Sequence, residues 1–286
     1  MYKLCILGAG ILWGCMGIFV KSMRALGFTT FEIVFIRVFV SLVCMAGYIY
    51  IKDKRLFKVK AKDLPLFFGS GVVSFIFFTF CYFSAMQLCS ISVAAVLLYT
   101  SPIFVMIMAC IFFKEKITPK KALAAVVAFS GCALVSGIFS EESTITPIGF
   151  LAGIGSGFGY ALYSIFTKAE LKKYEVPTAT FYTFLFASVF CVPFLSADTV
   201  SRMMTASGAA WSVAIGIVTC FAAYLLYNFG LKKTPASKAA VIAAIEPVAA
   251  AAIGILIYKE PLNITKAVGM VLVIASVAAL SRNPDR

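Results

Sequence analysis

Two stretches of the chain, SVAAVLLYTSP at residues 92–102 and SKAAVIAAIEP at residues 237–247, repeat one apolar pattern that ends in proline. They lie 145 residues apart, and residues 92–124 align on residues 237–269 without a gap. Nine positions are identical in this alignment: Ser92/Ser237, Ala94/Ala239, Ala95/Ala240, Val96/Val241, Pro102/Pro247, Lys114/Lys259, Glu115/Glu260, Lys121/Lys266 and Ala122/Ala267. A bias toward alanine and valine does not explain a shared proline followed by a shared Lys-Glu pair, so the alignment indicates an internal repeat.

The composition of the chain is that of a membrane protein. Of the 286 residues, 62% are hydrophobic and 13% are charged, with a mean hydropathy of +1.00, whereas soluble domains have about 45–50% apolar and about 25% charged residues. Apolar runs of the roughly 20 residues that a membrane-crossing helix needs recur along the whole length. They predict ten spans, near residues 4–20, 29–51, 64–86, 91–113, 119–138, 147–167, 177–197, 208–231, 236–258 and 262–281.

Local signals support these boundaries. Pro65, Pro119, Pro147 and Pro177 fall in the first turns of predicted spans, where a missing N–H costs nothing. We interpret residues 4–20 as the first span and not as a cleaved leader, because Trp13 interrupts the run and no small-residue cleavage site follows.

The basic charge of the chain indicates orientation in the membrane and not nucleic-acid binding. The net charge is +13, from 25 Lys and Arg against 12 Asp and Glu. With the N-terminus in the cytoplasm, 19 basic residues fall in predicted cytoplasmic segments, five in external segments, and Arg37 inside a span. Cytoplasmic loops carry the excess of Lys and Arg in membrane proteins. The distribution therefore predicts a multi-pass protein of the cell membrane with both termini cytoplasmic.

The repeat unit comprises five spans, so its second copy enters the membrane from the opposite side. A shift of 147 residues adds further matches, Ile18/Ile165, Phe19/Phe166, Lys21/Lys168 and Gly10/Gly157. We therefore predict an all-α integral membrane protein made of two inverted five-helix repeats, residues 1–143 and 144–286. Inverted repeats are common in secondary transporters, whose solute site lies at the repeat interface near the midplane.

The chain lacks residues that several kinds of chemistry require. There is no histidine, and none of the nine cysteines forms a Cys-x-x-Cys pair, which argues against a metal site and against hydrolysis by a general base. We predict that the protein is not an enzyme and that it has no cofactor and no metal, while coupling of transport to protons stays open.

Three ionisable side chains, Glu32, Arg37 and Glu246, lie clearly inside predicted spans. Glu32 is within a turn of the external interface and is expected to meet water. Glu246 lies at the middle of the ninth span, where a charge costs about 2.5–3.5 kcal/mol on insertion scales, so it needs a partner, a water-filled cavity or a proton. Two compatible interpretations follow: a buried Arg37–Glu246 pair that joins the two halves, and a solute or proton site.

Pro102 and Pro247 occupy equivalent positions in the middle of two spans, directly after Ser101 and Glu246. Each proline frees a backbone carbonyl one turn earlier. A simple kink explains both prolines, and a pair of symmetric bends that line a cavity is the functional alternative. Because Glu246 stands where the first repeat has Ser101, the two halves differ chemically at this point.

Aromatic side chains with polar groups recur within the spans. Trp13, Tyr99 and Tyr160 lie deepest, where their N–H and O–H groups need partners and their rings can hold a cation or an aromatic solute. Tyr82 and Tyr227 lie nearer span ends, where tyrosine ordinarily anchors a helix at the interface. The candidate solute-binding residues are Trp13, Arg37, Tyr82, Tyr99, Ser101, Tyr160, Tyr163, Tyr227 and Glu246.

The full chain resembles the drug/metabolite transporter superfamily, in its ten-helix EamA-type branch. The residues that carry this resemblance are, in chain order, Leu12-Trp13-Gly14, Phe19-Val20-Lys21, Ile36-Arg37, Ser92-x-Ala94-Ala95, Pro102, Lys114-Glu115, Glu246-Pro247 and Lys259-Glu260. The resemblance implies two inverted five-helix halves around a central cavity, which spans one to four and six to nine line while spans five and ten lie toward the periphery. It also implies export of amino acids or other small metabolites, with exchange or import in some members.

We therefore expect a secondary transporter that exports or exchanges small metabolites, amino acids or related amphipathic solutes, by alternating access. A lipid or lipid-precursor flippase of the same architecture is the nearer alternative, and a membrane-embedded enzyme the more distant one. A channel would need a ring of charges, and a carrier of phosphate esters would need several basic groups in its cavity, where only Arg37 is available. The expected partners are a small solute and the bilayer, with no nucleic acid, and the protein is expected to be a monomer or a weak homodimer.

Overall fold

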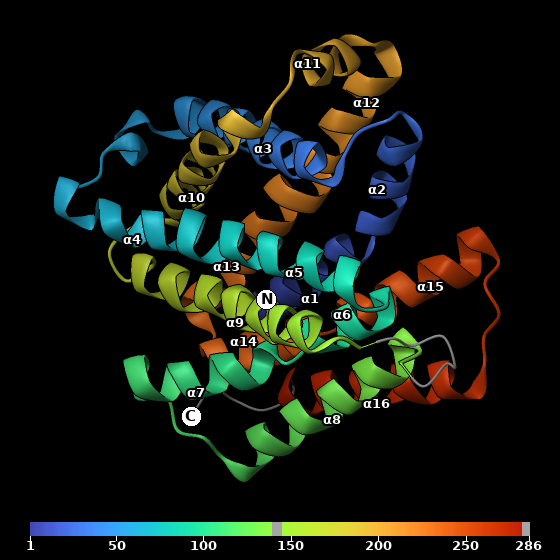
Figure 1. Cartoon of the computed structure of the whole chain (residues 1–286). Coiled ribbons are helices and arrows are strands. Elements are labelled where there is room, and N and C mark those ends of the chain that lie inside the picture. Colours follow the sequence, from blue (N-terminus) through green and yellow to red (C-terminus); the bar gives the residue numbers. More distant parts are fainter. Residues whose placement is uncertain (139–144, 282–286) are drawn as a thin grey trace.

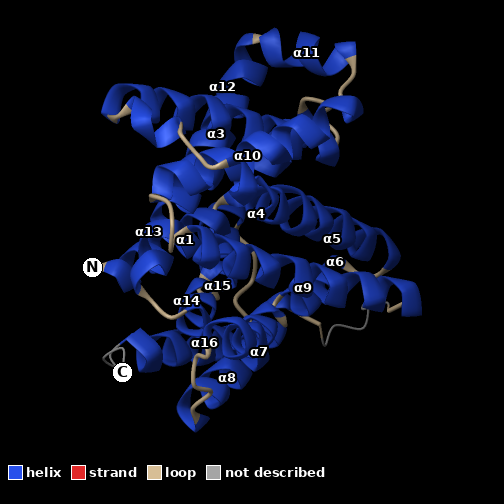
Figure 2. Ribbon diagram, turned by 90° about the vertical axis from the view of Figure 1, so that its left-hand side faces the viewer, coloured by secondary structure: helices blue, strands red, loops and turns tan. Residues whose placement is uncertain are grey.

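The computed structural model describes residues 1–138 and 145–281, and this part of the chain is helical (Figures 1 and 2). Ten helical segments are long and apolar enough to cross a membrane, which confirms the predicted number. Their bounds are Tyr2–Ala25, Thr30–Lys52, Ala61–Leu88, Ile91–Phe113, Pro119–Ser136, Pro147–Glu170, Val176–Phe194, Ala206–Lys233, Ala236–Tyr258 and Ile264–Ser281. The predicted boundary between residues 143 and 144 lies outside the described residues.

The first five spans and their connections comprise eight α-helices, one π-helical segment and two short 3-10 helices. Span one consists of α1 (Tyr2–Gly14) and α2 (Met16–Ala25), and span two of α3 (Thr30–Lys52). After η1 (Lys54–Phe57) and η2 (Ala61–Asp63), span three runs through α4 (Leu64–Phe68), the π-helical η3 (Gly69–Ile76) and α5 (Phe77–Leu88). Span four is divided into α6 (Ile91–Leu98) and α7 (Ser101–Phe113), and span five is α8 (Pro119–Ser136).

The second five spans follow the same plan. Spans six and seven are α9 (Pro147–Glu170) and α10 (Val176–Cys191), the latter extended by η4 (Val192–Phe194). A short helix, α11 (Ala197–Met204), precedes span eight, which runs through α12 (Ala206–Ile215), the π-helical η5 (Gly216–Ala222) and α13 (Ala223–Lys233). Span nine is divided into α14 (Ala236–Ala243) and α15 (Glu246–Tyr258), and span ten is α16 (Ile264–Ser281).

Residues at the helix starts explain where the spans begin. Thr118 and Thr146 accept hydrogen bonds from backbone N–H groups in the first turns of α8 and α9, each followed by proline at the first helical position. Such side chains satisfy donors that have no partner inside the helix, and proline there removes a donor that would be unsatisfied anyway. Pro65, Pro119, Pro147 and Pro177 all occupy first-turn positions, as predicted.

The two halves repeat each other in detail. Each has a π-helical segment in its third span and a division in its fourth. The helices before the last span of each half both end at a lysine in the left-handed region, Lys114 with φ 55° and Lys259 with φ 57°. The fifth spans, α8 and α16, pack against each other at the bottom of the molecule as Figure 1 shows it.

Each mid-span proline lies just after a two-residue break in its helix, at the place where a kink was expected. One helical piece ends at Leu98 and the next begins at Ser101; the equivalent gap lies between Ala243 and Glu246. Proline clashes with the carbonyl one turn earlier and offers it no N–H. Glycine in the opposite half lets another helix approach these openings: a Cβ on Gly10 would lie 2.9 Å from the Ala243 carbonyl oxygen, and one on Gly157 would lie 2.9 Å from the Leu97 carbonyl oxygen.

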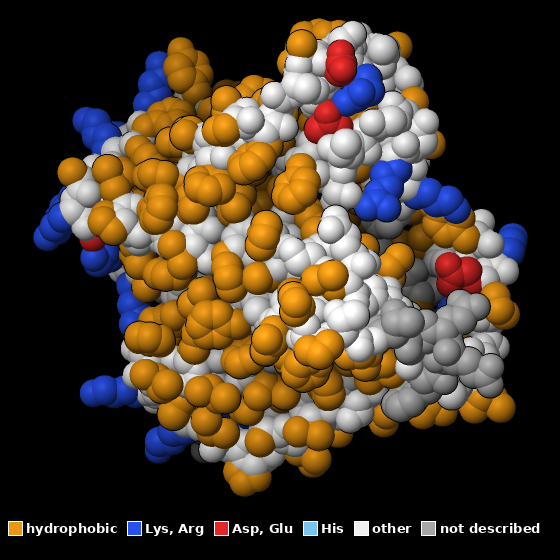
Figure 3. All heavy atoms as spheres, in the orientation of Figure 1, with side chains coloured by type: hydrophobic (Ala, Val, Ile, Leu, Met, Phe, Trp, Pro, Cys, Tyr) orange, Lys and Arg blue, Asp and Glu red, His pale blue; other side chains and the backbone are white. Residues whose placement is uncertain are grey.

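The first span begins and the last span ends at the same end of the molecule, where Lys3 Nζ donates a hydrogen bond of 3.0 Å to the Ser281 carbonyl. We call this the terminal end and its opposite the far end. Figure 3 shows Lys and Arg gathered along one edge of the molecule, beside a broad apolar face. Such a face is suited to contact with lipid.

Candidate functional site

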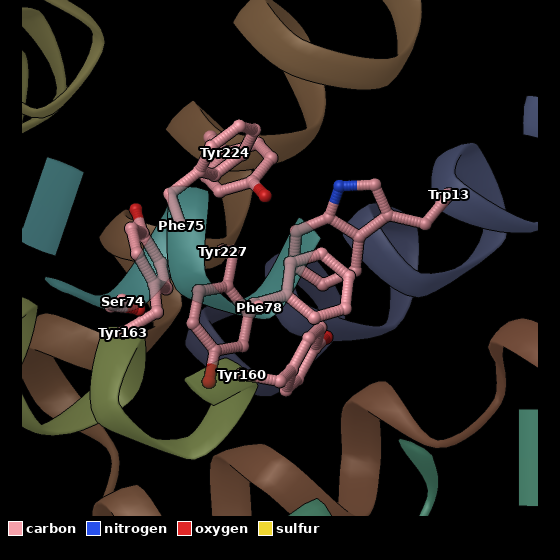
Figure 4. A pocket seen from close by; sticks show the side chains of 8 residues that line it. All are labelled: Trp13, Ser74, Phe75, Phe78, Tyr160, Tyr163, Tyr224 and Tyr227. Atoms are coloured by element: carbon pink, nitrogen blue, oxygen red, sulfur yellow. The ribbon is translucent and has the colours of Figure 1, made fainter. Parts of the chain in front are cut away.

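The centre of the molecule is a cluster of aromatic rings around Trp13. The Trp13 ring centroid lies 5.2 Å from that of Tyr224, 5.3 Å from that of Tyr227 and 6.2 Å from that of Tyr160. Edge-to-face pairs at such distances are favourable. The rings come from α1, α9 and α13, so three spans and both repeats meet here (Figure 4).

A small cavity lies among these rings. It has a volume of about 10 Å³, close to the room that one water molecule needs. Its lining residues are Trp13, Ser74, Phe75, Phe78, Tyr160, Tyr163, Tyr224 and Tyr227 (Figure 4). The cluster is therefore closed in this conformation, and a solute of several heavy atoms would enter only if the rings moved apart.

A second cavity of similar size lies between the two divided spans. It is lined by Leu98, Tyr99, Ser101, Pro102, Tyr160, Ala240, Ala243, Ala244 and Glu246. Ser101 and Glu246, which the repeat places at equivalent positions, therefore face one space. Tyr160 lines both cavities.

Arg37 reaches the aromatic cluster from α3. It is 7% exposed, and its guanidinium lies 5.5 Å from the centroid of the Phe75 ring. Its Nε donates to Cys220 Sγ at 3.1 Å and its Nη1 to Met16 Sδ at 3.1 Å. Sulfur is a weak acceptor, so this buried cation keeps most of its capacity to bind an anion.

The expected Arg37–Glu246 ion pair does not form. No ion pair within the described residues joins the two side chains. Arg37 lies against Phe75, whereas Glu246 lines the second cavity. The region thus holds a cationic and an acidic side chain that form no ion pair with each other.

Hydrogen bonds hold two of the tyrosines in place. The Tyr163 hydroxyl lies 2.9–3.0 Å from the amide group of Asn228, which also donates to Thr180 Oγ1 at 2.9 Å. The Tyr227 hydroxyl lies 2.7 Å from Ser164 Oγ. These hydroxyls are occupied, so Tyr163 and Tyr227 offer their rings and not their polar groups to a solute. Tyr227 is buried, and its place in the cluster replaces its alternative interpretation as an interface anchor.

The Trp13 indole has the opposite property. It is buried, and its Nε1–H has no hydrogen-bond partner in the described structure. Buried donors are almost always paired, so this N–H is available to an acceptor on a solute. Tyr82, by contrast, lines neither central cavity and touches the cluster through the Phe78 ring, at 5.9 Å between centroids.

Several residues of this region were not foreseen from the sequence. Phe75 and Phe78 line the first cavity, but nothing distinguishes them among 28 phenylalanines. Tyr224 was not among the candidate site residues, although its spacing of three from Tyr227 places both on one helical face.

The expectation for the charged residues of the spans was wrong in two places. Glu32 does not meet water: it is 5% exposed, and its carboxylate accepts from Thr199 Oγ1 at 2.5 Å and from Arg202 at 2.6 Å. These partners come from α11, a helix that the sequence pattern did not predict. Glu170, assigned to a loop, ends α9 and is 0% exposed, without a hydrogen bond of ordinary geometry to either oxygen.

The lining residues come from the spans that the resemblance implied. α8 and α16, the fifth and tenth spans, contribute nothing to either central cavity. Spans two and seven, which the resemblance also implied, line neither cavity. Arg37 of span two contacts the Phe75 ring, and Phe184 of span seven packs against Tyr224 with 5.2 Å between ring centroids.

Comparison with known proteins agrees with this architecture. A solved crystal structure superposes on 97% of the chain and on 95% of its own length with a TM-score of 0.83, at 16% sequence identity, which shows a shared fold. Uncharacterized transporters are similar over nearly the full length: one from Archaeoglobus fulgidus is 27% identical over 94% of this chain and 92% of its own, and YwfM of Bacillus subtilis is 26% identical over 100% and 95%.

The sequence profile of the EamA-like transporter family matches both halves separately, at residues 1–137 and 147–282. These two ranges correspond to the two sets of five spans. The chain belongs to the EamA-like transporter family, within the drug/metabolite transporter superfamily.

Proposed function

We propose that this transporter exports or exchanges amino acids or closely related amphipathic solutes by alternating access, and that its solute binds at the aromatic cluster around Trp13. The proposal rests on the two cavities that flank the Tyr160 ring. A solute that bridged them would contact the aromatic faces of one cavity and the polar groups of the other.

The observation that carries the proposal is the separation of Arg37 from Glu246. An α-amino acid has a carboxylate and an ammonium group beside a side chain that is often apolar. The carboxylate suits the guanidinium of Arg37, whose hydrogen bonds to Cys220 and Met16 go to sulfur, a weak acceptor. The ammonium suits Glu246, and the rings between them suit an apolar side chain.

Uptake into proteoliposomes tests the proposal. Purified protein would be reconstituted and offered a panel of radiolabelled amino acids, with and without a pH gradient. We expect saturable uptake of zwitterionic solutes and strong loss of uptake for analogues that lack either charge. Uptake that ignores both charges, or movement of fluorescent phospholipid between leaflets in its place, would contradict the proposal and favour a flippase.

In the proposed orientation the protein lies in the cytoplasmic membrane, with both termini in the cytoplasm. The support is the bias of Lys and Arg toward the segments at the terminal end. A reporter that is active only in the cytoplasm, fused to the C-terminus, is expected to be active. An active external reporter at the same place would contradict this orientation. We further propose that the protein works as a monomer or a weak homodimer, which light scattering in detergent would test.

A further inference from the structure

Glu115 joins the two repeats at the terminal end. It follows Lys114 directly after α7, and its carboxylate accepts hydrogen bonds from the N-terminus of α14. The bonds come from Ala236 N at 2.7 Å, Ser237 N at 3.2 Å and Ser237 Oγ at 2.5 Å. A carboxylate is well suited to the unpaired N–H groups at a helix start. Because Pro235 precedes this helix and gives no side-chain cap, Glu115 supplies the cap from the other half of the protein.

Glu260, the repeat counterpart of Glu115, makes a different contact at the far end. The backbones match: Glu115 N donates to the Ala109 carbonyl at 3.2 Å, and Glu260 N donates to the Gly254 carbonyl at 3.1 Å. The Glu260 side chain, however, stays within its own half, where it accepts from Lys266 Nζ at 3.1 Å. Two counterpart residues on equivalent turns therefore have different partners.

The start of α6, which corresponds to the start of α14, is capped from within its own half, by Ser90, whose Oγ accepts from Val93 N at 3.4 Å. By the shift of 145 residues, Ala236 and Ser237 correspond to Ile91 and Ser92 at the start of α6. Ala236 is 0% exposed, whereas Ile91 is 64% exposed. Likewise α7 packs against α14, while the counterpart pair, α15 and α6, has at most marginal contact. Glu115 therefore joins α7 to α14 at the terminal end, whereas no hydrogen bond among the described residues joins Glu260 to α6 at the far end.

Each glutamate has a lysine counterpart available in its own half. Lys266 holds Glu260, but its counterpart Lys121 donates to the Lys116 carbonyl at 3.1 Å and not to Glu115. Glu260 also has a resting place that Glu115 lacks. Its carboxylate lies over Gly254, so that a Cβ there would be 2.7 Å from an oxygen, and the counterpart of Gly254 is Ala109, which has that Cβ.

We propose that Glu115 and Glu260 are alternating gate residues: each caps the first turn of the divided span in the opposite half, and only one of them does so at a time. In the conformation described here Glu115 caps α14 and Glu260 rests on Lys266. In the opposite conformation Glu260 caps α6 through Ile91 N, Ser92 N and Ser92 Oγ, and Glu115 is released to Lys121. The inference rests on the alternating access proposed above, and assigns to it the contacts that close each end.

Thiol labelling of counterpart cysteines tests this exchange without any solute. Ala236→Cys and Ile91→Cys keep the backbone N–H groups of the two helix starts, and peptide-resolved mass spectrometry allows the nine native cysteines to stay in place. Ala236→Cys is covered in the described conformation and reacts only when the less populated opposite conformation exposes it. With N-ethylmaleimide we therefore expect Ile91→Cys to react at least about tenfold faster than Ala236→Cys.

Three further substitutions are expected to change the two labelling rates in opposite directions. Glu115→Gln should speed labelling at Ala236→Cys and slow it at Ile91→Cys. Gly254→Ala, which displaces the Glu260 carboxylate from its resting place, and Lys266→Gln, which frees the same carboxylate, should both do likewise. Lys121→Gln is the matched control and should neither speed labelling at Ala236→Cys nor slow it at Ile91→Cys, since Lys121 does not hold Glu115 in this conformation.

Opposite changes at the two positions would support the exchange. Faster labelling at Ala236→Cys with no change at Ile91→Cys would mean that Glu115 only caps α14, and would overturn the proposal. If Ala236→Cys does not fold, slower labelling of Ile91→Cys in the Gly254→Ala protein decides alone. Because no solute is present, a negative result here is separate from a negative result in the uptake assay.

Discussion

The two repeats bring equivalent positions to one central region but equip them differently. Trp13 and Tyr160 correspond by the shift of 147 residues, and both line the first cavity. Ser101 and Glu246 correspond by the shift of 145, and both line the second. The inverted repeat thus supplies a symmetric frame, and the chemistry of the site lies where the two copies differ. A solute that meets an acid on one side only has a preferred orientation.

The largest effect is expected at the Ser101/Glu246 pair, if Glu246 couples transport to protons. Glu246→Gln keeps the shape of the side chain and removes its charge. We expect the variant to insert and to exchange solute, while accumulation driven by a proton gradient falls to an inside-to-outside ratio of about one, because a carboxyl that no longer binds protons cannot link them to transport.

The measurement is uptake into proteoliposomes with an imposed pH gradient. Ser101→Ala is the matched control in the other repeat and should keep most of the accumulation. Full accumulation by Glu246→Gln, or transport by the unaltered protein that ignores pH, would remove the coupling role and leave Glu246 as a solute contact.

A large structural effect is expected at the counterpart glycines Gly10 and Gly157. In Gly10→Ala and Gly157→Ala the new methyl group meets a backbone carbonyl oxygen at 2.9 Å, which forces helices apart at a cost of about 1–3 kcal/mol each. The fraction of protein that stays monodisperse after heating in detergent measures this. Gly17→Ala is the control, because its methyl group meets nothing within 4 Å. Equal tolerance of all three substitutions would show that the divided spans do not depend on these close approaches.

A moderate effect on binding is expected at Tyr99. Tyr99→Ala removes a ring from the second cavity, and we expect solute affinity to fall about five- to tenfold, equivalent to roughly 1 kcal/mol of aromatic contact. Solute-dependent thermal stabilisation of the purified protein reports the affinity, and yield in the membrane reports folding. Tyr82→Ala, outside both cavities, should leave affinity unchanged. Parallel loss of yield and transport in Tyr99→Ala would indicate a packing role.

The smallest effect is expected from Trp13→Phe. The Trp13 N–H has no partner in the described structure, and loss of a buried unpaired donor is nearly neutral or stabilising. We expect the unfolding temperature to change little, and solute affinity to fall about threefold or more if the N–H donates to the solute. A clear drop in the unfolding temperature with unaltered affinity would show that the ring serves packing alone.

Much of the fold could be read from the sequence, because lipid allows few solutions. A backbone in hydrocarbon must satisfy its own hydrogen bonds, so each long apolar run had to be a helix, and ten such runs with a five-span repeat predicted two inverted halves. The predicted bounds of span nine, residues 236–258, agree with the structure. The helix α11 was missed because an eight-residue amphipathic segment has no such constraint.

For the site, local sequence determined which residues were unusual and tertiary structure decided how they are used. A charge in mid-span and a tryptophan in an apolar run stand out without any structure, since each is costly unless something compensates for it. Whether Arg37 pairs with Glu246 or with the sulfur atoms of Met16 and Cys220 depends on how four spans cross, to within a few ångströms. The repeat likewise predicted that Glu115 and Glu260 are equivalent, but only the packing of the two halves gave them different partners.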